Sequence, residues 1–249
     1  MYVHQLNPVL LTLGFLEIRY YGLVYLFGFV LCYLYIFKDR KNLKLSLKQV
    51  DDLTFWMVIG LFIGARLFHF IFNEPLTLIR EPWQLVMAWL GGMSFFGGLI
   101  GVFAGAALYI RLTKIQLDII QIADLLVIPV TFALMLGRLA NFLNSELLGL
   151  PSASPWCVIF PLMDLICRHP YQLYAAFSHL ILLCVLIAVG KHPKKGRMLA
   201  TFLIMYGFLR VITDFFRDDW RIGSLTIWQY ASIGIIFVGV WVWKQHGKS

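Results

Sequence analysis

Long apolar runs recur along the whole chain and are separated by short polar segments. Each run is close to the ~20 residues that a helix needs to cross a bilayer. The pattern predicts about seven transmembrane helices, at about residues 20–37, 53–72, 86–110, 119–136, 171–190, 198–213 and 226–243. None of the runs alternates as a barrel strand does, and lipid cannot satisfy free backbone groups, so all are expected to be helices.

The segments between the runs complete the prediction of an all-α integral membrane protein. Residues 8–18 are read as an amphipathic, interfacial segment that leads into the first span, and residues 137–170 as an outer loop. We expect one membrane domain over residues 1–249. Composition agrees, because hydrophobic residues make up 60% of the chain, charged residues 14%, and mean hydropathy is +0.79. A single water-soluble core could not bury so much apolar surface, so lipid is the expected solvent.

The basic segments predict the orientation of the bundle. "KDRKNLKLSLK", "RLTK", "KHPKKGR" and "KQHGK" follow alternate spans and contain every lysine. By the positive-inside rule they face the cytoplasm, which places the N-terminus outside and the C-terminus inside. The net charge of +8 then reflects these loops and anionic lipid headgroups, and no motif for nucleic-acid binding is present.

Cations away from the inner segments are all arginines, and two polar islands contain some of them. "GRLANFLNSELLG", residues 137–149, combines Arg138, Asn141 and Glu146 at the end of an apolar span. An arginine flanked by amides supplies donors for a phosphate or carboxylate, and the acid can hold the arginine in place. The alternatives are a helix-end cluster that satisfies backbone groups and simple avoidance of lysine near lipid.

The second island, "MYGFLRVITDFFRDD", places Tyr206, Arg210, Asp214 and Arg217 at spacings that form one narrow stripe on a helix. Two arginines with a carboxylate and a phenol are suited to bind an anion beside an internal counter-ion. A ladder of i,i+4 pairs that only stabilises the helix is the alternative.

Further features carry weaker signals. The glycines of "WLGGMSFFGGLIGVFAG" predict close helix packing or a local break beside a ligand. His169 is a possible acid or base, or a structural residue, and the following proline is expected to start a helix. Arg66 and Asp124 lie inside spans, where each needs a partner, and we expect them to pair with each other. Cys157 and Cys167 share the outer loop and could form a disulfide, whereas no cluster predicts a metal site.

The islands resemble a known family. "GRLANFLNSELLG" matches, at every fixed position, the signature G-R-x-[G/A]-N-F-hydrophobic-N-x-E-x-x-G of the prolipoprotein diacylglyceryl transferases. Further similarity appears in "RYYGLVYLFGF", "GGMSFFGGLIG", "RHPYQLY" and "YGFLRVITDFFR", in the family's order and over roughly residues 18–217. The resemblance implies an enzyme that transfers the diacylglyceryl group of phosphatidylglycerol to the lipobox cysteine of a preprolipoprotein. The product is a thioether, and glycerol phosphate leaves.

The resemblance also implies a location and a set of roles. The enzyme would lie in the bacterial cytoplasmic (inner) membrane with its site toward the outer leaflet, among membrane lipids and without a cofactor. Arg138 and Arg210 would bind and stabilise the phosphate as catalytic residues. The expected contacts to phosphatidylglycerol come from Tyr21, Arg138, Asn141, Glu146, Gly149, Tyr206, Arg210, Asp214 and Arg217.

Three positions depart from the family pattern. Phe96 stands where the family usually has a histidine that is often proposed as the base, Ala175 replaces an acid, and Asp214 replaces a glutamate. His169 or Tyr206 could take over the proton, or arginine electrostatics could suffice. The departures also leave open a paralogue with a different acceptor, or a catalytically silent lipid- or lipoprotein-binding member.

Overall fold

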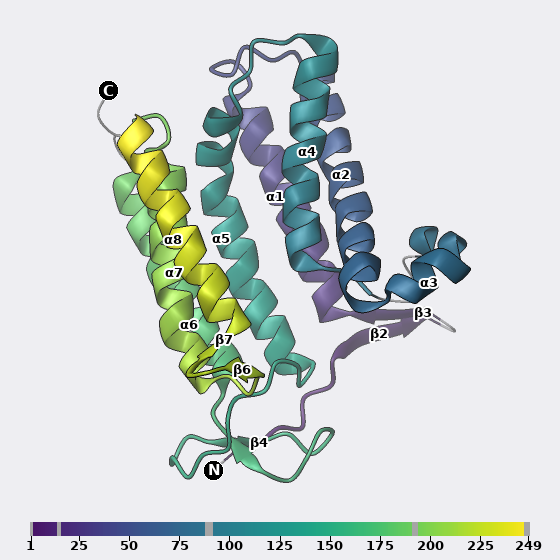
Figure 1. Ribbon diagram of the computed structural model, residues 1–249, viewed down its shortest axis with the longest axis vertical. Helices are drawn as coiled ribbons and strands as arrows, with labels where there is room; N and C mark the ends of the chain where they lie inside the picture. Colours follow the sequence, from purple (N-terminus) through teal and green to yellow (C-terminus); the bar gives the residue numbers. More distant parts are fainter. Residues whose placement is uncertain (1, 14–15, 88–91, 191–193, 247–249) are drawn as a thin grey trace. The chain divides into compact units, whose positions relative to one another are not determined.

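The structure is a computed structural model that describes the chain except for residues 1, 14–15, 88–91, 191–193 and 247–249. Its described part consists of long helices joined by short helices and strands (Figure 1). The chain divides into two compact units. One comprises Met1–Tyr35 with Ile120–Ser249, and the other comprises Ile36–Ile119.

Six helices in the described part are long and apolar enough to cross a membrane. They are α1 (Tyr20–Asp39), α2 (Leu47–Asn73), α5 (Ile119–Leu143), α6 (Tyr171–Val189), α7 (Arg197–Thr213) and α8 (Ile227–His246). The bounds of each helix contain a predicted span or agree with it to within a few residues. The apolar helix α4 (Phe95–Thr113) is shorter. An integral membrane protein is confirmed, whereas the number of seven spans and their orientation remain predictions.

The start of the third predicted span is wrong. The 3-10 helix η1 (Pro82–Val86), which follows the short helix α3 (Pro75–Arg80), ends at the residue where the span was predicted to begin. α4 then begins after Ser94, whose hydroxyl accepts a hydrogen bond from the Gly97 amide at 3.3 Å. A side-chain cap of this kind marks a helix start, and apolar content alone cannot reveal it.

Within the unit Ile36–Ile119, α2 and α4 lie side by side (Figure 1) and pack through glycines. A methyl group at Gly64 would overlap the Gly97 carbonyl, and one at Gly101 would overlap the Gly60 carbonyl. Small residues allow such close backbone approach between membrane helices. The predicted close packing of the glycine-rich stretch is therefore confirmed.

The predicted pairing of Arg66 with Asp124 is wrong. The Arg66 guanidinium donates to the backbone carbonyls of Gln84, Leu85, Met87 and Gly92, which follow α3. The Asp124 carboxylate instead accepts hydrogen bonds from the amides of Gly196 and Leu199 at the start of α7. Both charges serve backbone groups that a helix end or a loop leaves without intrahelical partners.

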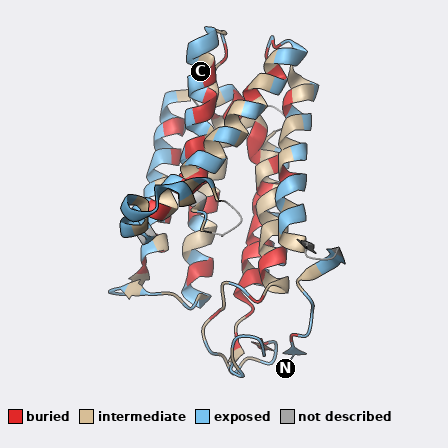
Figure 2. Ribbon diagram, turned by 90° about the vertical axis from the view of Figure 1, so that its right-hand side faces the viewer, coloured by how far each residue is buried: buried red, intermediate tan, exposed pale blue. Residues whose placement is uncertain are grey.

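In the other unit, the core lies between α5, α6 and α7, around Val127, Leu182, Leu186, Met198 and Tyr206. α8 packs against α7, and Gly207 and Gly239 lie at this contact. In Figure 2 buried residues run along one side of the long helices, while the other side is exposed and apolar, as lipid-facing surface is.

Short strands lie near the ends of the helices in this unit. β1 (Tyr2–Val3) runs parallel to β4 (Val158–Ile159), and β4 pairs antiparallel with β5 (Cys167–Arg168). A disulfide joins Cys157 and Cys167 across these strands. Residues 8–18, expected as an interfacial lead-in, belong to a hairpin of β2 (Val9–Leu13) and β3 (Leu16–Arg19). β6 (Arg221–Ile222) and β7 (Leu225–Thr226) form another.

Candidate functional site

A pocket lies where the C-terminal ends of α5 and α7 meet the N-terminal half of α6. Its lining includes Arg138 from α5, Tyr171 and His179 from α6, and Tyr206 and Arg210 from α7. The two arginines predicted as catalytic residues come from different helices, α5 and α7, and share this pocket. The structure therefore brings the two polar islands together.

Arg210 is held in place by its own helix and by α6. Its guanidinium donates to the Tyr206 hydroxyl at 2.8 Å, and its Nε lies 3.6 Å from the Asp214 carboxylate. Asp214 is fully buried and accepts a hydrogen bond from the Tyr171 hydroxyl at 2.6 Å. A buried carboxylate needs a counter-charge and donors. Tyr171 donates to Oδ1, and Arg210 supplies the counter-charge beside Oδ2, which has no hydrogen bond among the described residues.

Arg217 departs from the predicted stripe. α7 ends at Thr213, a 3-10 turn η3 (Asp214–Phe216) follows, and Arg217 has extended backbone dihedral angles. Its guanidinium lies over the Tyr171 ring at 5.8 Å and pairs with Asp219 at 3.0 Å. Tyr206, Arg210 and Asp214 thus follow the helical spacing, whereas Arg217 approaches Tyr171 from outside the helix.

Arg138 makes no hydrogen bond or ion pair with any residue that the structure describes. It lines the pocket, and its charge acts on Tyr171 and His179. Glu146 was expected to hold this arginine. Its carboxylate instead accepts hydrogen bonds from the amides of Asn141 at 2.9 Å and Asn144 at 3.2 Å, so that expectation is wrong. The donors of Arg138 are left available for a bound anion.

Gly149 lies where three segments of the chain cross. A methyl group there would overlap the His169 carbonyl, and the residue bridges to Arg217. Its own carbonyl accepts a hydrogen bond from Arg168, which also binds Asp164 and Asp218. The glycine of the first island therefore fixes the loop beside the pocket through close backbone approach.

Asp164 and His4 lie outside the membrane-spanning helices and have shifted pKa values. The hydrogen bonds from Arg168 hold the pKa of the Asp164 carboxyl below its usual range. His4 is buried between the rings of Phe142 and Phe160, and this burial lowers the pKa of its imidazole. Both groups join the outer loop to its surroundings.

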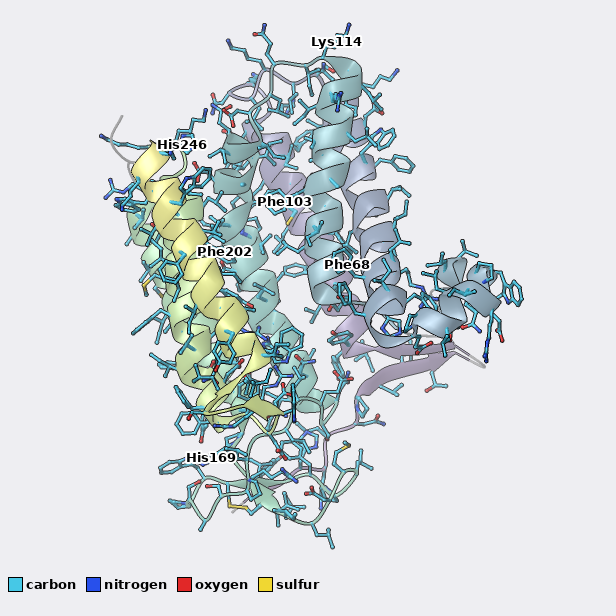
Figure 3. All side chains as sticks on the ribbon, viewed as in Figure 1. Phe68, Phe103, Lys114, His169, Phe202 and His246 are labelled. Carbon is cyan, nitrogen blue, oxygen red and sulfur yellow. A yellow bond between two sulfur atoms is a disulfide. The ribbon has the colours of Figure 1, made fainter. Side chains whose placement is uncertain are left out.

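His169 and Tyr21 are not among the residues that line the described pocket. The His169 Nδ1 lies 3.1 Å from the Tyr174 hydroxyl, and its ring packs on Phe216. Figure 3 shows His169 at the opposite end of this unit from His246. Tyr21, on α1, shares a 2.8 Å hydrogen bond with Tyr25, whose phenol experiences the charges of Arg138 and Glu146. Phe96 is the second residue of α4, in the other unit, and its side chain lies outside the described residues.

Sequence reasoning missed two residues of the pocket, Tyr171 and His179. Around Pro170, the sequence analysis singled out only His169 and Ala175. Once Pro170 is taken as a helix start, positions 171, 175, 178, 179 and 182 share one face by helical spacing, and all of them line the pocket. The signal was a polar stripe in an otherwise apolar helix.

Comparisons with known proteins show which family this chain resembles along its length. A family model described as prolipoprotein diacylglyceryl transferase matches residues 8–244. A phosphatidylglycerol–prolipoprotein diacylglyceryl transferase of Nitrosomonas europaea is 36% identical, and the alignment covers 100% of this chain and 94% of the relative. Proteins of the same name from Legionella pneumophila (strain Lens) and Zymomonas mobilis are each 37% identical. These alignments cover 96% of both chains for the first, and 90% of this chain and 82% of the relative for the second. The chain belongs to the prolipoprotein diacylglyceryl transferase family.

Proposed function

We propose that this protein transfers the diacylglyceryl group of phosphatidylglycerol to the thiol of a lipobox cysteine in preprolipoproteins. The observation that carries the proposal is the pairing of Arg138 and Arg210 in one pocket between apolar helices. The phosphodiester of the substrate becomes a phosphomonoester with extra negative charge as glycerol phosphate leaves, and this charge needs cationic donors in a fixed arrangement. Arginine supplies two parallel donors to such a group, and a low-dielectric environment strengthens the interaction.

The two arginines differ in how far other side chains already hold them in position. Arg210 is oriented by Tyr206 and Asp214, and Asp214 in turn is held by Tyr171. Arg138 has no hydrogen-bond or ion-pair partner among the described residues. The substrate phosphate would accept the hydrogen bonds that its guanidinium can donate. In the proposed reaction the cysteine sulfur attacks the glycerol carbon that bears the phosphate ester. The carbon–oxygen bond breaks, its electron pair goes to the phosphate oxygen, and glycerol phosphate departs.

The remaining predicted residues support the same headgroup site. Asn141 and Glu146 form the polar end of α5, and Gly149 fixes the loop that follows. Tyr21 shares a hydrogen bond with Tyr25, and the Tyr25 phenol interacts with the charges of Arg138 and Glu146 at the polar end of α5. We assign these residues, with Tyr206, Asp214 and Arg217, to the binding of phosphatidylglycerol. His169 remains a possible base only if the chain rearranges around it.

We further propose that the site faces the outer leaflet of the bacterial inner membrane. Lys194, Lys195 and Lys244 lie at the ends of α6, α7 and α8 that are remote from Arg138 and Arg210. Lysines favour the cytoplasmic side. The disulfide of Cys157 and Cys167 lies in the loop between α5 and α6, near the arginines, and disulfides persist in oxidising compartments. Both observations support an outward-facing pocket.

Mass spectrometry of the acceptor tests the proposal. Purified protein is incubated with phosphatidylglycerol and a synthetic lipobox peptide, and both the peptide mass and released glycerol phosphate are measured. The expected result is a peptide heavier by one diacylglyceryl group and an equimolar amount of glycerol phosphate. A matched peptide with serine in place of the cysteine should stay unmodified. Lipid binding without either product would contradict the proposal.

A further inference from the structure

One group in the pocket has no role in the arrangement described so far. His179, on α6, lines the pocket together with Arg138 and Arg210, and it is 5% exposed. Its ring centroid lies 5.8 Å from that of Tyr206. The Nδ1 atom is buried and forms no hydrogen bond of ordinary geometry with the described residues, and the only backbone group that interacts with the ring among them is the Ala175 carbonyl. A buried polar atom without a partner is rare and calls for a ligand or a chemical role.

We propose that His179 is the general base that takes the proton from the acceptor cysteine. This inference rests on the proposed function and adds to it the residue that activates the nucleophile. A thiol attacks slowly because the thiolate is the nucleophile, so the S–H proton must leave before or during attack. A neutral imidazole offers one ring nitrogen as the acceptor for that proton.

The proton and electrons balance within the pocket. The S–H bond breaks toward Nδ1 of His179 while the sulfur–carbon bond forms. The glycerol carbon–oxygen bond breaks, and its electron pair goes to the phosphate oxygen beside the arginines. The imidazolium then returns its proton to the departing glycerol phosphate. Histidine is the commonest side chain in this double role of base and then acid.

The surroundings of His179 favour this role over a structural one. The charged or titratable groups that line the pocket with it are Arg138 from α5, Tyr206 and Arg210 from α7, and Tyr171 from its own helix. Both arginines keep the free ring neutral, and a neutral imidazole has one ring nitrogen that can accept a proton. When the phosphate of the donor lipid occupies the pocket, its negative charge offsets that repulsion. His169, by contrast, already has Tyr174 at 3.1 Å from its Nδ1.

An acceptor that needs no base tests the assignment. The lipobox peptide is made with cysteine and, separately, with selenocysteine, whose selenol is already ionised near neutral pH. His179→Gln should lower the transfer rate to the cysteine peptide by about 100-fold or more, and the rate to the selenocysteine peptide by less than about 5-fold. His246→Gln, at the remote end of the unit, is the matched control and should leave both rates unchanged. Arg138→Lys should impair both acceptors alike, because it acts on the leaving phosphate.

Two outcomes would overturn the assignment. One is equal loss with both acceptors in His179→Gln, and the other is selective rescue by selenocysteine in His169→Gln instead. A measurement on the unaltered protein guards against a variant that fails to fold. Its rate with the cysteine peptide should fall as pH falls, and the selenocysteine peptide should abolish that decline. A decline that persists with selenocysteine contradicts a base role. No transfer by the unaltered protein to either peptide would overturn the proposed function itself.

Discussion

Tyr171, the first residue of α6, donates a 2.6 Å hydrogen bond to the fully buried carboxylate of Asp214 at the end of α7. The two residues are 43 positions apart in the chain. Asp214 also faces Arg210, so this contact sets the position of an arginine in the pocket. The Tyr171 ring lies under Arg217 as well. The Tyr171 side chain therefore connects α6 to the end of α7 and helps to position the charged groups of the site.

Removal of that hydroxyl should cost stability and activity together. Tyr171→Phe leaves one oxygen of a buried carboxylate without its donor, which costs about 1–3 kcal/mol. We expect a lower unfolding temperature in detergent and slower diacylglyceryl transfer. Tyr230→Phe is the matched control, because its hydroxyl is exposed and only reaches the Ile222 carbonyl at 3.2 Å. Equal unfolding temperatures for the two variants would contradict the structural role given to Tyr171.

The glycine contact between α2 and α4 predicts a graded response to added methyl groups. Gly64→Ala would force a methyl group onto the Gly97 carbonyl, and overpacking of this kind costs about 1–3 kcal/mol. Gly98→Ala is the control on the same interface, because its methyl group would make ordinary contacts, the nearest at 3.5 Å to Leu61. Thermal unfolding of both variants provides the comparison. If Gly98→Ala is the more destabilising change, the described helix contact is incorrect.

The buried imidazole of His4 predicts a pH dependence of stability. Burial lowers the pKa of this imidazole in the folded protein below the usual value for histidine. The folded state therefore binds the proton less readily than the unfolded state. The stabilisation that this neutral ring provides is present above about pH 6.5 and decreases as pH falls below it.

This dependence is tested by measuring unfolding temperatures of the unaltered protein and of His4→Phe in steps from about pH 7.5 to about pH 5. This range spans the ordinary histidine pKa of about 6.5. The aromatic replacement keeps a ring between Phe142 and Phe160 but cannot titrate. We expect a shallower loss of stability toward low pH in the variant. Identical slopes would show that His4 does not contribute to the pH dependence.

Much of the site followed from local spacing. Tyr206, Arg210 and Asp214 share a stripe because α7 is regular through Thr213, and the helical period applies there. Arg217 left that stripe because a 3-10 turn follows Thr213, and no residue type in "ITDFFR" signals where a helix tightens. Hydrophobic periodicity therefore located the element well and its last turn poorly.

Partners between distant segments were harder to predict. Arg66 and Asp124 were expected to pair because each is a charge inside an apolar span, but each found backbone groups at helix ends or loops. The Glu146 carboxylate likewise accepts hydrogen bonds from neighbouring side-chain amides and does not pair with Arg138. Sequence shows that a buried charge needs a partner but not which one, because backbone groups compete everywhere along the chain.

The central claim is that the guanidinium of Arg138 stabilises the departing phosphate, and Arg138→Lys tests it most directly. Because Arg138 has no hydrogen bond or ion pair with the described residues, this change should leave the unfolding temperature intact. Lysine keeps the charge but lacks the planar pair of donors. The decisive measurement is the rate of thioether formation on the lipobox peptide, with Arg80→Lys at an exposed position as the control. We predict a loss of about 100-fold for Arg138→Lys and none for the control, whereas an unaltered rate in Arg138→Lys would contradict the account.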